Sequence, residues 1–167
     1  MIDGRKGRDD NKTVKLVGNN PHQSLLASVS TTLTDFSNVR VFLNSIERNS
    51  RKSKGAYKTG LAHFQLFLLN SKYQSSHQHQ NQQQPQYNYY NIETIIQAFE
   101  NNELNVYTIL DAFVNYLTET HLTTSSITLY VTSVRSYLAY YDIDIIPSKF
   151  KRKVKMPKLQ IEDEIHH

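Results

Sequence analysis

The side chains best able to do chemistry lie toward the C-terminal end of the chain, between residues 123 and 158. A hydroxyl-rich start, TTSS at 123–126, opens the segment TTSSITLYVTSVRSYLAYY, and the basic segment SKFKRKVKMPK follows at 148–158. Hydroxyls and free N–H groups at a helix start bind phosphate, and Arg135 can fork onto a phosphate or onto guanine in a major groove. This order predicts a helix presented to a phosphate backbone, followed by a basic linker.

The distribution of charge agrees with such a partner. The net charge is +4 and the isoelectric point about 9.2, which is compatible with nucleic acid without requiring it. One basic run extends from Arg48 to Lys58 with no acid inside it, a second covers 149–158, and Arg135 is the only Lys or Arg between Glu93 and Asp144. Basic charge is therefore focused on particular surfaces.

Other functional classes lack their signals. The sequence has no cysteine, which excludes disulfides and thiolate zinc sites, and it has no P-loop, HExxH, GxSxG or Rossmann pattern. His63 and His121 are isolated and are expected to be packing or surface residues, and His77 and His79 in a Gln-rich tract make a poor metal site. With no apolar run near 18 residues and no signal-peptide pattern, we expect a cytoplasmic protein without metal or cofactor, nucleoid-associated when bound to DNA, that does not contact a membrane.

Periodicity predicts an all-α protein. Residues 1–33 read as a disordered N-terminal tail, 34–148 as a helical domain and 149–167 as a basic linker and tail, with a low-complexity insertion at 70–91. Helices are expected from an N-cap at Asp35 to about residue 49, over 53–69, over 92–99, after an N-cap at Asn105, and after Thr124 or Ser125. These elements predict a bundle of four to five helices.

Two polar rows flank the apolar stripes of the longest helices. Thr128, Thr132 and Arg135 lie about 100, 140 and 80° around the helix from Ile127, and Lys54, Lys58 and Gln65 hold the corresponding place on the helix at 53–69. If the helices pack by their stripes, the rows share one outward surface suited to DNA. The alternative is an ordinary solvated face. The tyrosines at helical spacing are expected in the core or at its edge, and none has the cationic surroundings of a nucleophile.

These segments resemble a known family. From about residue 29 to 159 the chain is similar to the N-terminal core-binding domain of tyrosine recombinases, the phage-integrase family, and especially to archaeal integrases. The matching pieces are VRVFLNSIERNSRKSKGAYKTGLAHFQLFL, VYTILDAFVNYLTE, TTSSITLYVTSVRSYLAYY and IIPSKFKRKVKMPKL, of which SITLYVTSVRSYL is the most specific. The Gln-rich stretch departs from the compact loop of the family. The resemblance implies a SAM-like orthogonal bundle that clamps one face of duplex DNA.

The resemblance also implies what the chain does not do. The catalytic arginine, lysine, His-x-x-Arg and tyrosine of the family have no counterpart after Leu159, so we expect a non-catalytic DNA-binding module. The alternatives are a regulatory partner of a full-length recombinase or of a separate catalytic fragment, and a truncated integrase remnant. The expected DNA-binding residues are Lys52, Lys54, Tyr57, Lys58, Ser125, Ser126, Thr128, Thr132, Arg135, Lys151, Arg152, Lys153 and Lys155.

Overall fold

The computed structural model describes residues 21–70 and 90–158, and this part of the chain is entirely helical. It holds seven α-helices and one 3₁₀ turn, which is more than the four to five helices predicted. The elements are α1 (Pro21–Thr32), η1 (Leu33–Asp35), α2 (Ser37–Glu47), α3 (Arg51–Leu69), α5 (Thr94–Glu100), α6 (Val106–Glu119), α7 (Thr124–Tyr140) and α8 (Pro147–Lys153). The all-α prediction is confirmed, while most of the Gln-rich insertion lies outside the described residues.

The N-terminal prediction was wrong for residues 21–33. They form α1 and the start of η1 instead of continuing a disordered tail. Leu26, Val29 and Leu33 recur every three to four residues and pack on the core, with Val29 buried and Leu33 fully buried. This apolar stripe supplies the tertiary packing that a short helix needs. Residues 1–20 lie outside the described part of the chain.

The helix starts differ from expectation at two of three caps. Asp35 lies inside η1, and α2 begins after Phe36 without a side-chain cap. Asn105 caps α6 as predicted, and its side chain accepts hydrogen bonds from the N–H groups of Tyr107 and Thr108. At α7 the cap is Thr123 instead of the predicted Thr124 or Ser125, and its hydroxyl accepts from the N–H of Ser126.

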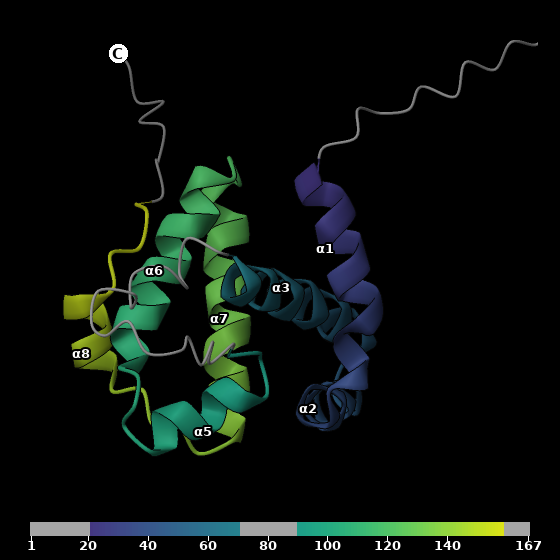
Figure 1. The fold of residues 1–167 in the computed structure, drawn as a ribbon, viewed down its shortest axis with the longest axis horizontal. Helices are drawn as coiled ribbons and strands as arrows, with labels where there is room; N and C mark the ends of the chain where they lie inside the picture. The colour runs from purple at the N-terminus through teal and green to yellow at the C-terminus, as the bar shows by residue number, and fades with distance from the viewer. Residues whose placement is uncertain (1–20, 71–89, 159–167) are drawn as a thin grey trace, which may run out of the picture.

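Helix α3 runs through the centre of the molecule and crosses α7 at close range. Figure 1 shows α1 and α2 on one side of α3, with α5, α6, α7 and α8 on the other. Its second half, from Gly60 to Leu68, is buried throughout, and its most extensive interface is with α7. Gly60 permits this crossing because an added Cβ would lie 2.7 Å from the Cβ of Ser133 and 3.1 Å from the Cα of Tyr130.

Two buried polar side chains, one on α3 and one on α7, hydrogen-bond to the backbone of Ile92 just before α5. The side chain of Gln65 accepts a hydrogen bond from the N–H of Ile92 at 2.7 Å, and the hydroxyl of Tyr137 donates to the carbonyl of Ile92 at 2.8 Å. The prediction that Gln65 belongs to an outward polar row was therefore wrong. A buried amide stays in a core when it satisfies a backbone group that would otherwise lack a partner.

The basic linker prediction was wrong for residues 149–154. Residues 147–153 form α8, and Phe150 and Val154 are 8% and 3% exposed within the common core. Pro147 begins this helix, a position where its missing N–H costs nothing. The two apolar side chains, four residues apart, dock α8 against the bundle, so the folded domain extends beyond residue 148.

The core also contains His63, as a packing residue rather than a surface one. It is 3% exposed, its Nδ1 has no hydrogen-bond partner among the described residues, and its ring stacks on Tyr130 with centroids 4.5 Å apart. His22 of α1 lies 6.3 Å away between ring centroids and is hydrogen-bonded to the hydroxyl of Tyr116. Burial first, and then the neighbouring His22, lower the pKa of His63 to about 4.

We predict from this site that acid destabilises the fold. The unfolded chain binds a proton at His63 near pH 6.5 and the folded chain only near pH 4, so stability is lost as pH falls through that window and is unaffected above it. The pKa shift is equivalent to a loss of about 2 kcal/mol between pH 7.5 and pH 5. Urea unfolding at both pH values measures it. His63→Phe, which keeps a stacked ring, should remove this part of the pH dependence, and an unchanged dependence would contradict the assignment.

Candidate nucleic-acid interface

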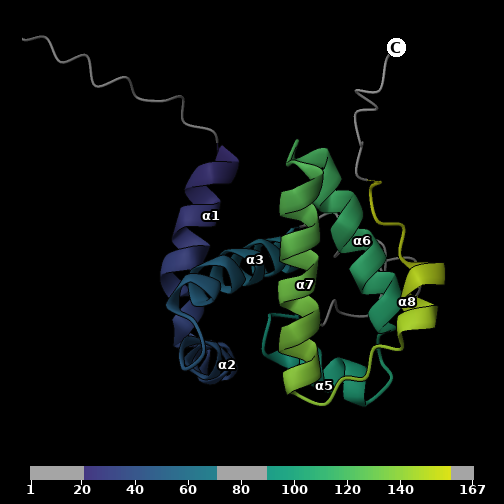
Figure 2. The ribbon, with the colours of Figure 1, turned by 180° about the vertical axis from the view of Figure 1, so that it is seen from behind.

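The outward face of α7 carries the hydroxyls singled out in the sequence. Ser125, Thr128 and Thr132 are exposed, and Ser126 is half-buried beside the Thr123 cap, whose hydroxyl donates to the Ser126 hydroxyl at 3.0 Å. Figure 2 views this side, with α7 in front, α2 and α3 to its left and α6 and α8 to its right. The first turn of α7 therefore presents side-chain hydroxyls to solvent, which suit a phosphate partner, while the N–H of Ser126 is taken by the Thr123 cap.

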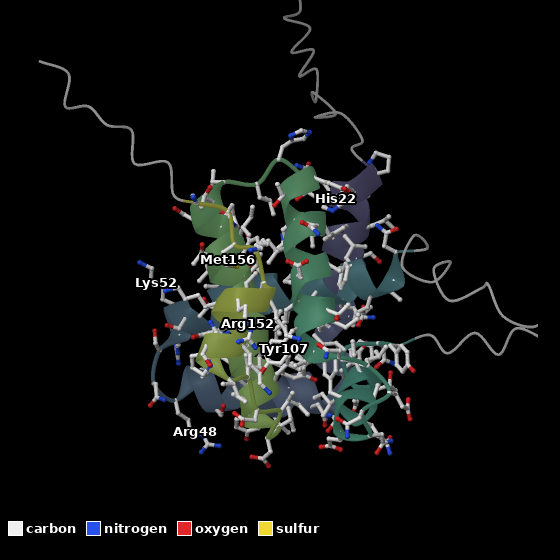
Figure 3. The ribbon with its side chains drawn as sticks, turned by 90° about the vertical axis from the view of Figure 1, so that its left-hand side faces the viewer. His22, Arg48, Lys52, Tyr107, Arg152 and Met156 are labelled. Atoms are coloured by element: carbon white, nitrogen blue, oxygen red, sulfur yellow. The ribbon has the colours of Figure 1, made fainter. Side chains whose placement is uncertain are left out.

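Helix α8 and the residues after it form the more basic flank. Lys151, Arg152, Lys153 and Lys155 are all exposed, and so is Lys149. Figure 3 shows α8 in front of α6 and α7, with Arg152 labelled on it. Within the described residues none of these cations forms a salt bridge, because the one ion pair there joins Lys54 to Glu47. Their charge remains available to an external anion.

Fewer side chains at the start of α3 are free to meet a ligand than the sequence predicted. Lys52 is exposed and Lys58 half-buried, but the Nζ of Lys54 lies 2.7 Å from the Oε2 of Glu47. The hydrogen bond and the charge of Lys54 lower the pKa of that carboxyl. The ring of Tyr57 packs edge-on against Phe42, with centroids 6.0 Å apart. Arg51, Lys52 and Lys58 are therefore the Lys and Arg residues of α3 that form no salt bridge within the described residues.

The two polar rows do not lie side by side. Helix α3 meets the edge of α7 formed by Tyr130 and Ser133, whereas the guanidinium carbon of Arg135 lies 4.0 Å from the centroid of Phe150 on α8. The row of Thr128, Thr132 and Arg135 thus borders α8, and the width of α7 separates it from α3. The surface has the hydroxyl face in the middle, the α8 cations on one flank and Lys52 with Lys58 on the other.

A shallow groove cuts into the α8 side of this surface. Its volume is about 510 Å³, and the residues that line it are Thr132, Arg135, Ser136, Ala139, Asp142, Ile143, Asp144 and Ile145. Asp142 takes a φ of 62°, a left-handed conformation that Asp tolerates better than most residues and that turns the chain after α7. The two carboxylates set an acidic limit to the basic surface at this end of α7.

Three residues that shape this surface were not among the predicted site residues. Thr123 was missed because sequence alone does not decide which of four adjacent hydroxyl residues is the cap. Lys149 was grouped with the basic run but not with the site. The packing role of Phe150 was missed because a single aromatic residue among five cations reads as part of a linker, although the spacing of Phe150 and Val154 was a helical signal.

Neither a metal centre nor a membrane span is evident in residues 21–70 and 90–158. No three potential ligands among His, Asp and Glu gather in this part of the chain, and none of its helices is long and apolar enough to cross a membrane. Comparison of the chain with protein-family models, with curated proteins and with solved structures yields no match.

Proposed function

We propose that the chain is a DNA-binding module of the core-binding type found in tyrosine recombinases, with a SAM-like bundle that clamps one face of duplex DNA. The observation that carries the proposal is the exposed hydroxyl face of α7 flanked by unpaired cations on α8. Backbone phosphates are met by hydroxyls, helix N–H groups and Lys or Arg side chains. The resemblance of SITLYVTSVRSYL to the family adds its own support.

In this proposal the contacts are mainly to phosphate. Ser125, Thr128 and Thr132 approach the sugar-phosphate backbone from α7, and the α8 cations neutralise phosphates along the same strand. Arg135 contributes little direct base readout, because its guanidinium already stacks on Phe150. The module therefore recognises duplex shape and charge more than sequence.

A gel-shift titration at two salt concentrations tests this proposal. With a labelled duplex of mixed sequence, we expect binding at 50 mM salt that weakens at least tenfold at 200 mM, because phosphate contacts release counterions. An unrelated duplex of the same length should bind within a few-fold of the first. Failure to bind either duplex at 50 mM salt would refute the proposal.

A second candidate is an interaction module for a recombinase or a separate catalytic fragment. Leu129 and Tyr140 are 42% and 44% exposed, and their spacing of eleven residues places them about 20° apart on α7. These two exposed apolar side chains lie about three turns apart on the outward part of α7, where a protein partner would cover them. Co-purification with a recombinase that survives nuclease treatment would favour this candidate, and loss of the complex after nuclease would favour DNA.

A further inference from the structure

Helix α8 is too short and too charged to persist by itself. It has seven residues, PSKFKRK, of which four are Lys or Arg. Isolated helices of this length are unstable in water, and the like charges on neighbouring turns repel one another. The helix therefore depends on the contacts that hold it to the rest of the fold.

Those contacts come from two helices, α6 and α7. Phe150 and Val154 enter the core beside α6. The N–H of Lys155 donates to the Oδ1 of Asp111 at 2.9 Å, and the N–H of Ile146 donates to the hydroxyl of Tyr107 at 3.0 Å. From α7, the guanidinium of Arg135 covers the ring of Phe150. Helix α8 is thus fixed at both ends by α6 and at its single aromatic residue by α7.

The surroundings of Arg135 favour a stacking role. Its guanidinium carbon is 4.0 Å from the ring centroid, within the range of a cation–π contact, and Arg is suited to this contact because its guanidinium is planar and weakly hydrated. The carboxylates of Asp142 and Asp144 line the same groove, but within the described residues neither forms a salt bridge with Arg135. Phe150 is accordingly the neighbour that best accounts for its half-buried position.

We infer that Arg135 is a positioning residue, which holds α8 on the fold and thereby keeps the α8 cations next to the hydroxyl face of α7. For DNA binding the inference rests on the proposed function. For the free protein it stands alone: the Arg135–Phe150 stack sets how often α8 opens. The exposed cations then act as a preorganised surface rather than as a flexible basic tail.

Amide hydrogen exchange of the free protein tests whether Arg135 holds α8 on the fold. Arg135→Met and Phe150→Leu should each speed exchange of the Phe150 and Val154 amides, which donate to Ile146 and Phe150. We expect roughly a tenfold increase, equivalent to about 1.4 kcal/mol of local opening. The double variant should be only slightly faster than either single variant, because both remove the same contact. Unchanged exchange in Arg135→Met would overturn the inference.

DNA titrations of the same proteins test whether the stack keeps the α8 cations in place for DNA binding. Phe150→Leu keeps every charge, so a reduced salt slope in this variant means that α8 has lost its position. If instead Arg135 contacts phosphate directly, Arg135→Met lowers the slope by about one and Phe150→Leu leaves it unchanged, which would overturn the positioning role. Arg40→Met, a matched change on α2, should leave the exchange of α8 unaltered.

A replacement variant and the exchange experiment separate failure of the positioning role from failure to fold or to bind DNA. If Phe150→Leu fails to fold, Arg135→Lys replaces it, since this variant retains the charge but loses the planar face; faster α8 exchange supports the stack and wild-type exchange contradicts it. If the wild-type protein binds no duplex, the proposed function fails, while the exchange experiment still decides whether Arg135 holds α8.

Discussion

Replacing Lys151, Arg152 and Lys153 together with alanine is expected to weaken duplex binding on the order of a hundredfold at moderate salt. All three side chains are exposed on α8, and none has an ion-pair partner within the described residues. Each phosphate contact that is lost should reduce the slope of log affinity against log salt by about 0.9. Fluorescence anisotropy of a labelled duplex over a range of salt concentrations measures both quantities.

A charge-conserving variant is the matched control. Lys151→Arg, Arg152→Lys and Lys153→Arg together exchange the side chains without altering the charge of α8, and this protein should keep the wild-type slope. The alanine variant should also retain its melting temperature within a few degrees, because exposed residues contribute little to stability. Equal slopes in the alanine variant and the wild type would show that α8 does not touch DNA.

The largest effect on the fold is expected from Gly60→Val. The new Cβ would sit 2.7 Å from the Cβ and Oγ of Ser133 and 3.1 Å from the Cα of Tyr130. Ser133 is completely buried and its hydroxyl donates to the carbonyl of Leu129 at 2.8 Å, so the neighbour has no free space to enter. Overpacking against a backbone should cost about 3 kcal/mol or more in the free energy of unfolding. Urea denaturation monitored by circular dichroism measures it.

Gly55 provides the control on the same helix. A Cβ added there meets nothing within 4 Å, and Gly55 is exposed. Gly55→Ala should therefore raise the free energy of unfolding by about 0.5–1 kcal/mol through helix propensity alone. A loss of less than about 1 kcal/mol in Gly60→Val would contradict the close crossing of α3 and α7.

Much of the helical order could be predicted from apolar spacing and caps. The spacing predicts a stripe of Ile127, Val131, Val134, Leu138 and Tyr141, of which the first four are buried and Tyr141 is half-buried. Asn105 caps α6 as predicted. Such features are local, because a stripe or a cap is decided by residues within a few turns. The tyrosines also follow the expectation in the main, since Tyr107 and Tyr137 are buried while Tyr140 remains 44% exposed.

The remainder depended on tertiary contacts that no local pattern contains. Gln65 looks polar and outward, yet it is buried because the N–H of Ile92, 27 residues away, needs an acceptor. Residues 21–32 looked like a tail, but their helix is stabilised by docking on α3. Similarly, α8 looked like a linker because four of its seven residues are Lys or Arg and only one, Phe150, is a large apolar residue.

On the candidate surface, too, some features follow from local sequence and others from contacts between helices. Exposure of Ser125, Thr128 and Thr132 follows from their places outside the apolar stripe of α7. The pairing of Lys54 with Glu47 and the stack of Arg135 on Phe150 join separate helices. Two of the predicted contact residues are therefore occupied within the fold.

Amide chemical-shift mapping of the labelled protein with an unlabelled duplex tests the central claim most directly. The proposal predicts the largest changes in the exposed first turns of α7, from Thr124 to Thr132, and in residues 149–155, with small changes in α5. Shifts that fade as salt is added would identify them as phosphate contacts. Changes confined to α1 or α5, or no changes at low salt, would contradict the assignment of the α7–α8 surface to DNA.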